Sequence, residues 1–273
     1  LAYHVETEKY PDGLNVYDNS RFIDLNVYGP RRFSVAGRQP WNGDSAWPDT
    51  EILAEPYLGD FGDVLHYYAR ADDREQKASY ARMLSRIADG DPNERLADHR
   101  WALFNIDRKI RGYESKQFDP HPRASELLPA KAWVMYRPES GFDRGAALRF
   151  GATLSHGHTD ELGLQIYGAG RELSYDPGHK PKRHFMNSFM RQTVAHNTAV
   201  VNETSQVPPA DDGGSVEFFT DREGYTVASV SNPQAYAHEG VDMYRRTTAF
   251  VDVSPEASYM VDIFRVGGAD TVD

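Results

Sequence analysis

The chain contains no cysteine, and this absence excludes several kinds of site at once. Without thiols there can be no disulfide, no thiolate nucleophile and no cysteine-ligated zinc. A metal ion would therefore need histidine, aspartate or glutamate ligands. A protein without cysteine fits any cellular compartment, so this absence does not indicate where the protein resides.

The sequence also lacks long apolar runs and an excess of positive charge. No run approaches the roughly 18 apolar residues of a membrane-spanning helix, so we expect no membrane partner. The first ten residues contain neither a basic segment nor an apolar core, and no signal peptide is visible. The formal net charge of −11 argues against nucleic acid as a partner. Net charge only sets a mean over the chain, however, and a local basic patch can reverse the electrostatic field at one site.

The periodicity of the apolar residues changes near residue 128. Before that point they recur at helical spacing, in two sets that end at Tyr68 and Ile87. After it the period becomes two, first over residues 162–166. Further strands are expected over residues 199–201, 216–219, 225–230, 247–253 and 259–264. Helices followed by strands predict an α+β multidomain protein, helical over residues 1–128 and all-β over residues 129–273.

Side chains suited to chemistry concentrate between residues 155 and 206. His156 and His158 are two residues apart, so on a strand they would share one face. Asp176 begins a tight Asp-Pro-Gly turn, and His196 opens the next expected strand. Two histidines and an aspartate brought together by a sheet form a donor set that suits Zn²⁺. The alternative is a hydrogen-bonded polar network that holds no metal.

The His-Gly-His-Thr-Asp segment at residues 156–160 also resembles the His-x-His-x-Asp core of the metallo-β-lactamase-like hydrolases. That core usually continues with a second histidine directly after the aspartate, whereas Glu161 follows here. It also belongs to a layered fold with strands before the motif, whereas helices are expected here. A metallo-hydrolase is therefore one alternative function.

Several motifs in the second half of the chain together resemble the heparinase II/III-like proteins. In order they are Pro-Glu-Ser-Gly, His-Gly-His-x-Asp, Tyr-Gly-x-Gly-Arg, Asp-Pro-Gly and Arg-Gln-Thr-Val-Ala-His-Asn-Thr. That family includes heparinase II and the related alginate and oligoalginate lyases. The resemblance spans about half of the chain, and it is specific because the motifs keep the expected order.

The resemblance implies the C-terminal part of an (α/α) toroid over residues 1–128, followed by a truncated antiparallel β-sandwich. Within the sandwich it places a metal, Zn²⁺ in a mainly structural role, on His158, Asp176 and His196. It matches His156 to the family histidine that faces the active-site cleft. The earlier toroid helices are expected to be absent from this chain.

The resemblance further implies a carbon–oxygen lyase that cleaves a uronic-acid polysaccharide, alginate- or glycosaminoglycan-like, by β-elimination. Such an enzyme would be periplasmic or secreted, take an acidic poly- or oligosaccharide as its partner and be compatible with a homo-oligomer. The tyrosine that often follows the family's Asp-x-Gly turn is replaced by His179. We therefore predict His156, Tyr17 and His179 as catalytic residues, with Tyr10 as a second candidate tyrosine. The same departure leaves open an inactive carbohydrate-binding or structural zinc-containing sandwich.

A basic stretch follows Asp176 in this otherwise acidic chain. A run of charges is usually a solvated loop, but its position directly after an expected metal ligand favours contact with an acidic substrate. The predicted substrate-binding residues are Lys182, Arg183, His184 and Arg191.

Overall fold

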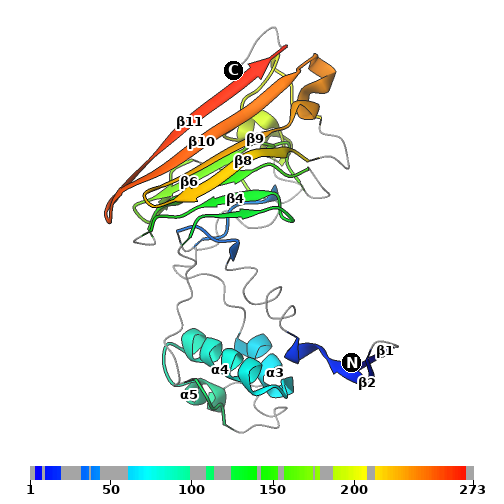
Figure 1. The fold of residues 1–273 in the computed structure, drawn as a ribbon, viewed down its shortest axis with the longest axis vertical. Coiled ribbons are helices and arrows are strands. Elements are labelled where there is room, and N and C mark those ends of the chain that lie inside the picture. Colours follow the sequence, from blue (N-terminus) through cyan, green and yellow to red (C-terminus); the bar gives the residue numbers. More distant parts are fainter. Residues whose placement is uncertain are drawn as a thin grey trace. The chain divides into compact units, whose positions relative to one another are not determined.

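The computed structural model describes most of the chain, and Figure 1 shows its helices and strands. The described residues are 4–7, 10–19, 32–36, 38–43, 61–98, 109–113, 124–139, 143–152, 157–174, 176–178, 187–207 and 213–268. They belong to two compact units. One unit contains residues 1–32 and 55–121, and the other contains residues 33–54 and 122–273.

The first unit is helical where the structure describes it, apart from a short hairpin. The hairpin pairs β1 (His4–Thr7) with β2 (Tyr10–Asn15), and the 3₁₀ turn η1 (Val16–Asp18) follows. The α-helices are α3 (Phe61–Arg70), α4 (Arg74–Ala88) and α5 (Pro92–Asp98). None of these described helices is long and apolar enough to cross a membrane.

The apolar spacing of α3 and α4 puts one face of each helix into a shared core. Its buried members include Phe61, Val64, Leu65, Tyr68, Tyr80, Met83 and Leu84. Each large apolar side chain buried in this way contributes about 1.5–3 kcal/mol. The predicted helical pattern is confirmed here. These few helices do not by themselves establish a toroid, which stays a prediction.

The second unit contains two antiparallel sheets. The first has the order β3 (Glu126–Leu128), β4 (Trp133–Tyr136), β5 (Gly145–Arg149), β6 (Leu164–Gly168) and β7 (Arg171–Glu172). The second has the order β11 (Ala257–Gly267), β10 (Met243–Ser254), β9 (Tyr225–Ser231) and β8 (Ser215–Arg222). The strands expected after residue 215 are therefore confirmed, with β10 and β11 longer than predicted.

The two sheets share one apolar core and so form a sandwich, as Figure 1 shows. Buried side chains of both sheets meet in it, among them Val134, Tyr136, Leu148, Leu164, Ala228, Val230, Tyr244 and Phe250. The hydroxyls of Tyr136 and Thr248 are hydrogen-bonded across this core, from β4 to β10. Alternation along each strand leaves the other face of the second sheet exposed, with Tyr259, Val261 and Ile263 on it.

Residues 33–43, where described, lie with the strands rather than with the helices. The backbone N–H of Trp41 donates to Gln165 Oε1 of β6 at 2.8 Å, and Gln165 Nε2 donates back to Trp41 O at 2.8 Å. The change in apolar period near residue 128 predicts instead that this segment belongs to the helical part. Local periodicity cannot detect a pairing between residues 124 positions apart, so only the folded chain shows it.

Candidate metal centre

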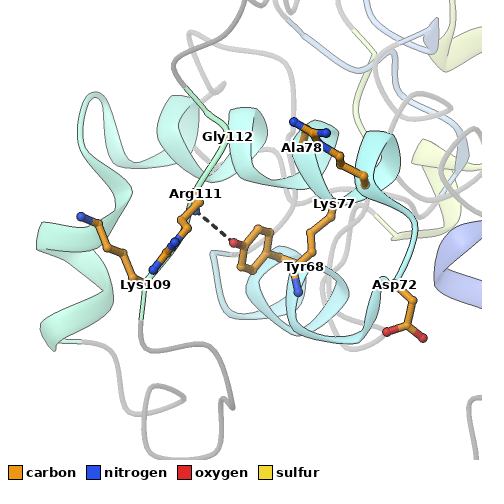
Figure 2. A pocket seen from close by; sticks show the side chains of 8 residues that line it. Tyr68, Asp72, Lys77, Ala78, Lys109, Arg111 and Gly112 are labelled. Carbon is orange, nitrogen blue, oxygen red and sulfur yellow. Dashed lines mark hydrogen bonds between the residues drawn. The ribbon is translucent and has the colours of Figure 1, made fainter.

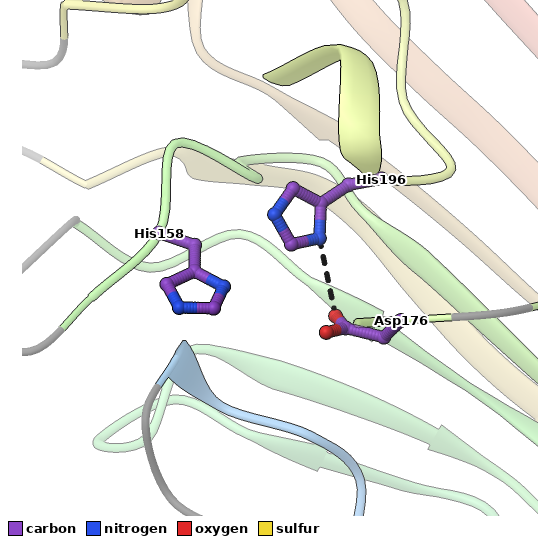
Figure 3. A group of neighbouring side chains, drawn as sticks. All are labelled: His158, Asp176 and His196. Atoms are coloured by element: carbon purple, nitrogen blue, oxygen red, sulfur yellow. Dashed lines mark hydrogen bonds and ion pairs between the residues drawn. The ribbon is translucent and has the colours of Figure 1, made fainter. Parts of the chain in front are cut away.

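Three loops of the sandwich bring His158, Asp176 and His196 together. His158 lies between β5 and β6, Asp176 follows β7, and His196 directly follows the 3₁₀ turn η5 (Thr193–Ala195). One ligand atom from each side chain lies within 4.8 Å of the others. Figure 3 shows the three side chains converging. The predicted grouping is therefore present in the structure.

The prediction that His196 opens a strand was wrong. His196 follows the 3₁₀ turn in extended backbone outside any strand, and His158 lies in an irregular segment. The strand expected at residues 199–201 is reduced to a single bridge between Val201 and Thr204. The three donors therefore lie in segments between strands. Their backbone is not part of a β-sheet, so it can direct each side chain toward the other donors.

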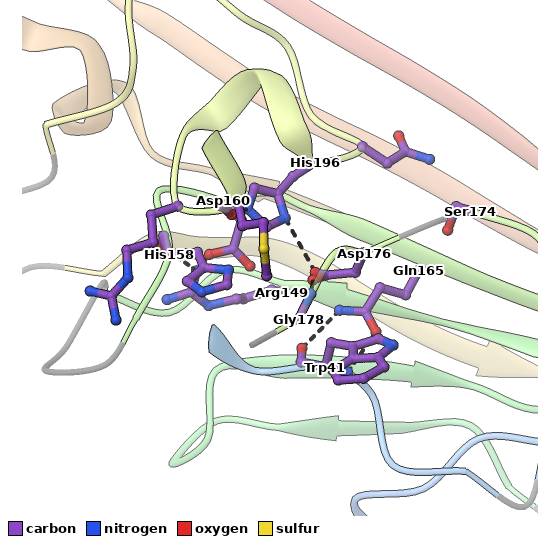
Figure 4. Close-up of polar contacts among 12 residues, drawn as sticks. Trp41, Arg149, His158, Asp160, Gln165, Ser174, Asp176, Gly178 and His196 are labelled. Carbon is purple, nitrogen blue, oxygen red and sulfur yellow. Dashed lines mark hydrogen bonds and ion pairs between the residues drawn. The ribbon is translucent and has the colours of Figure 1, made fainter. Parts of the chain in front are cut away.

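The carboxylate of Asp176 is held by its own turn. Gly178 N donates to Asp176 Oδ1 at 2.9 Å, which leaves Oδ2 to face His196. The backbone N–H of Asp176 donates to Glu172 Oε1 at 3.3 Å, and Trp41 Nε1 donates to Glu172 Oε2 at 3.1 Å. Burial raises the pKa of Glu172, and its bond with Trp41 opposes that shift. Trp41 and Glu172 thus support the turn that presents Asp176. Figure 4 shows Trp41 beside Gly178 of that turn.

The imidazole of His196 has a defined orientation. Its Nε2 lies 3.0 Å from the carbonyl oxygen of Met190, which can only accept, so Nε2 is the protonated nitrogen. Its Nδ1 lies 3.2 Å from Asp176 Oδ2. In a neutral ring Nδ1 is then an acceptor facing a second acceptor, and a cation or a proton between them resolves the conflict. Burial lowers the pKa of His196, but its bond to Asp176 and the charges of Asp160 and Asp176 outweigh burial and raise it.

This arrangement fits a metal ion such as Zn²⁺. A metal-bound histidine commonly donates its other ring N–H to a carbonyl, as His196 does to Met190. His158 is 1% exposed, and its ring centroid lies 5.2 Å from that of His196. Two imidazoles and one carboxylate are donors that Zn²⁺ accepts.

The segment that carries His158 is tied to the segment before His196. Thr159 donates to the carbonyl oxygen of Arg191 twice, from its N–H at 3.1 Å and from Oγ1 at 2.7 Å. Asp160, next in the chain, is buried and forms an ion pair with Arg149. The hydrolase alternative would need Asp160 as a ligand, but the group of possible ligands contains Asp176 in its place. The sandwich also differs from the layered fold of those hydrolases.

The second sheet fixes the other side of the centre. Arg246 of β10 is 2% exposed, and its Nη1 donates to Leu162 O at 2.7 Å and to Asn197 O at 2.6 Å. Its Nη2 donates to Asp262 Oδ2 at 2.6 Å, so the buried charge is paired. Asn197 directly follows His196, so this guanidinium positions the histidine loop.

The space beside the donors is small. A cavity of about 10 Å³ is lined by residues that include Asp160, Asp176 and His196. A volume of this size holds one water or one ion, whereas a sugar ring needs far more. Among the residues that the structure describes, the space beside Asp176 and His196 therefore has no room for a sugar ring.

The structure describes three other predicted site residues, Tyr17, Tyr10 and Arg191, and none of them belongs to the candidate ligand group. Tyr17 belongs to the helical unit, where its hydroxyl lies 3.3 Å from His66 Nε2. Arg191 is half-buried and contributes its carbonyl to the Thr159 contacts. Tyr10 lies in β2. The predicted residues His156, His179, Lys182, Arg183 and His184 lie outside the described residues.

The structure adds four groups that the sequence patterns did not indicate. Trp41 and Glu172 support the Asp176 turn, the Met190 carbonyl orients His196, and His66 pairs with Tyr17. The tryptophan in a glycine-containing loop was a weak signal for a packed anchor. A backbone carbonyl carries no signal in its residue type, so the Met190 contact could not be found from sequence.

Replacing Gly178 with alanine should loosen the centre. Gly178 has φ +56°, and an added Cβ would lie 2.4 Å from a ring carbon of Trp41. We expect Gly178→Ala to lower the free energy of unfolding by about 1–3 kcal/mol and to weaken metal binding. Chemical denaturation and metal titration measure the two effects.

The matched control is Gly170→Ala. Gly170 has a similar φ of +68°, but an added Cβ would meet nothing within 4 Å. This variant should show only the backbone strain of about 1 kcal/mol and should keep its metal affinity. Equal losses of stability and of metal affinity in both variants would show that the contact with Trp41 does not support the Asp176 turn.

Comparison with known proteins finds similarity to the family that the sequence motifs resemble. The family described as heparinase II/III-like, C-terminal, matches residues 143–272. An exo-oligoalginate lyase of Saccharophagus degradans is 33% identical over 138 residues, which make up 44% of this chain and 18% of that protein. All three candidate ligands lie within the matched family segment.

Solved structures extend the similarity of the fold. A heparinase III matches with a TM-score of 0.56 at 14% identity, over 92% of this chain and 33% of its own. A heparan sulfate lyase of Pedobacter heparinus matches with a TM-score of 0.55 at 15% identity, over 91% of this chain and 33% of its own. At such identities the likeness shows the fold alone. The chain thus spans a third or less of the length of these relatives.

Proposed function

We propose that the chain is part of a polysaccharide lyase, because residues 143–272 match the family described as heparinase II/III-like, C-terminal. The proposed substrate is a uronic-acid-containing polysaccharide, alginate-like or glycosaminoglycan-like, cleaved by β-elimination. The observation that carries the proposal is the His158, Asp176 and His196 group inside the matched segment. We also propose that residues 1–128 are the C-terminal part of an (α/α) toroid and that the protein is periplasmic or secreted.

The proposed reaction sets clear chemical demands. A base removes the proton at C5 of the uronic acid, the C4–O4 bond breaks, and a C4–C5 double bond forms. An acid protonates the departing oxygen. The C5 proton is weakly acidic because it lies beside a carboxylate, so neutralising that carboxylate with cations or hydrogen bonds stabilises the transition state.

The helical unit offers one acid–base pair. Burial and the charge of Arg70 lower the pKa of His66, while Asp63 opposes that shift. A neutral His66 ring can accept the hydrogen bond of the Tyr17 hydroxyl at Nε2, 3.3 Å away. This contact would orient the Tyr17 hydroxyl for its proposed catalytic role. His156 and His179 remain the proposed catalytic residues of the sandwich unit.

The proposed metal has a structural task in this scheme. Zn²⁺ held by His158, Asp176 and His196 would cross-link three loops of the sandwich. The burial of the three ligand side chains supports this division of roles. Lys182, Arg183, His184 and Arg191 are proposed to attract the acidic substrate.

The proposal predicts a new chromophore in the product. Incubation with alginate or heparan sulfate chains should raise the absorbance in the far ultraviolet as an unsaturated uronate forms. A neutral glucan is the control polymer and should show no change, because it has no carboxylate beside C5. Binding of acidic chains without this product would instead support the inactive carbohydrate-binding sandwich.

A further inference from the structure

The helical unit contains a cavity of about 740 Å³. This volume lies within the roughly 300–1,000 Å³ range of small-molecule and sugar sites. The charged side chains among its described lining residues are four cations and one carboxylate: Arg74, Lys77, Lys109, Arg111 and Asp72. Figure 2 labels four of these charged side chains, Asp72, Lys77, Lys109 and Arg111.

One wall of this cavity is the segment of residues 109–113, which is firmly anchored. Asn93 of α5 accepts from Ile110 N at 2.7 Å and donates to Ile110 O at 3.2 Å, and Ile110 is fully buried. Arg111 N donates to the Tyr68 hydroxyl at 3.0 Å, the dashed line in Figure 2. With Ile110 anchored in the core, its neighbours Lys109 and Arg111 are left exposed beside the cavity.

The facing wall is the first turn of α4. Arg74 and Lys77 are three residues apart and therefore share one face of the helix. The Lys77 ammonium lies 4.9 Å from the centroid of the Tyr68 ring, which holds it at the cavity. Gly112, at φ +85°, passes close to Ala78, with 3.7 Å between the position of an added Cβ and Ala78 Cβ. These two small residues let the segment approach α4.

The charge of this cavity opposes the charge of the chain. The chain carries a net −11, yet the described residues that line this cavity include four cations and a single carboxylate. Asp72 already accepts a hydrogen bond from Asn15 Nδ2 at 3.1 Å. Cations on two separate walls suit an extended ligand with spaced anionic groups, and the volume exceeds what one phosphate ion needs. Asp72 can additionally accept from hydroxyl groups, which sugars supply.

We propose that this cavity binds a segment of an acidic oligosaccharide through its carboxylate or sulfate groups. The ligand class rests on the proposed function, but the binding does not depend on turnover. The cavity belongs to the helical unit, whereas the His158, Asp176 and His196 group belongs to the sandwich unit.

The test compares two double variants of equal charge. Arg74→Gln with Lys109→Gln removes two exposed cations of the cavity and leaves the core untouched. Arg222→Gln with Arg265→Gln removes two exposed cations from the second sheet of the sandwich. Fluorescence anisotropy with labelled oligouronate, heparan sulfate oligosaccharide and neutral glucan oligosaccharide measures binding across a salt series, and thermal melts check folding.

We expect the cavity variant to bind acidic oligosaccharides about tenfold more weakly, with a flatter salt dependence. The sheet variant should change affinity less than about twofold, because Arg222 and Arg265 are not among the residues that line the cavity. The glucan should show no dependence on the cavity. A loss confined to the sulfated oligosaccharide would assign sulfate as the anion, and a loss shared with the oligouronate would assign carboxylate.

Equal weakening in the two double variants, or none in the cavity variant, would overturn this inference. Cavity-dependent binding of single-stranded DNA in preference to both acidic sugars would also overturn it, since the ligand would then be a phosphate chain. Cavity-dependent sugar binding without formation of unsaturated uronate would sustain this inference and contradict the proposed lyase activity. Formation of unsaturated uronate together with binding that does not depend on the cavity would support the proposed lyase activity and overturn this inference.

Discussion

His196→Ala is expected to abolish metal binding and to lower the melting temperature of the protein. The variant removes the nitrogen that faces Asp176 Oδ2 and leaves a buried carboxylate without its partner. Loss of a ligand that is present at a thousand times its dissociation constant costs about 4 kcal/mol. For a unit of this size that corresponds to a fall in melting temperature of roughly 8–16 °C. Elemental analysis and calorimetry measure the two effects.

Two controls separate loss of the metal from loss of packing. Chelator treatment should lower the melting temperature of the wild type but leave His196→Ala unchanged, because that variant has no ion to lose. His238→Ala removes an exposed histidine of the same unit and should keep both metal and stability. His158→Ala must lose the ion as well. Unchanged metal content in His196→Ala would remove the proposed centre.

His156→Ala is expected to reduce turnover by about 10²–10⁴-fold while the metal remains bound. The resemblance matches His156 to a histidine that faces the substrate, whereas the structure places its near neighbour His158 among the buried donors. Gly157 between them gives the backbone freedom to direct the two rings differently. Formation of unsaturated uronate measures turnover, and elemental analysis measures the metal.

The outcomes of this substitution separate three arrangements. Loss of turnover with metal retained supports the division between His156 and His158. Loss of the metal would show that His156 is a ligand and that the two roles are reversed. Full turnover would remove His156 from the reaction, and His238→Ala provides the baseline for a histidine without a proposed role.

The parts of this protein that could be predicted from its sequence depend on local patterns. Helical spacing up to Ile87 and the period of two after residue 215 correspond to α3, α4 and β8 to β11. Such patterns succeed because each element must direct its apolar side chains to one side. The grouping of His158, Asp176 and His196 could also be predicted, because only a few residue types can bind a metal in a chain without cysteine.

The tertiary structure alone decided how those donors are held. The Trp41 pairing with Gln165 joins residues 124 positions apart, and the carbonyl that orients His196 belongs to the backbone of Met190. Neither contact leaves a periodic trace or depends on a recognisable donor type. The basic cavity likewise forms only because Lys109 and Arg111 are brought to the first turn of α4 by buried Ile110. Spacing along a chain reports the contacts of one element, whereas these sites arise between segments that only folding brings together.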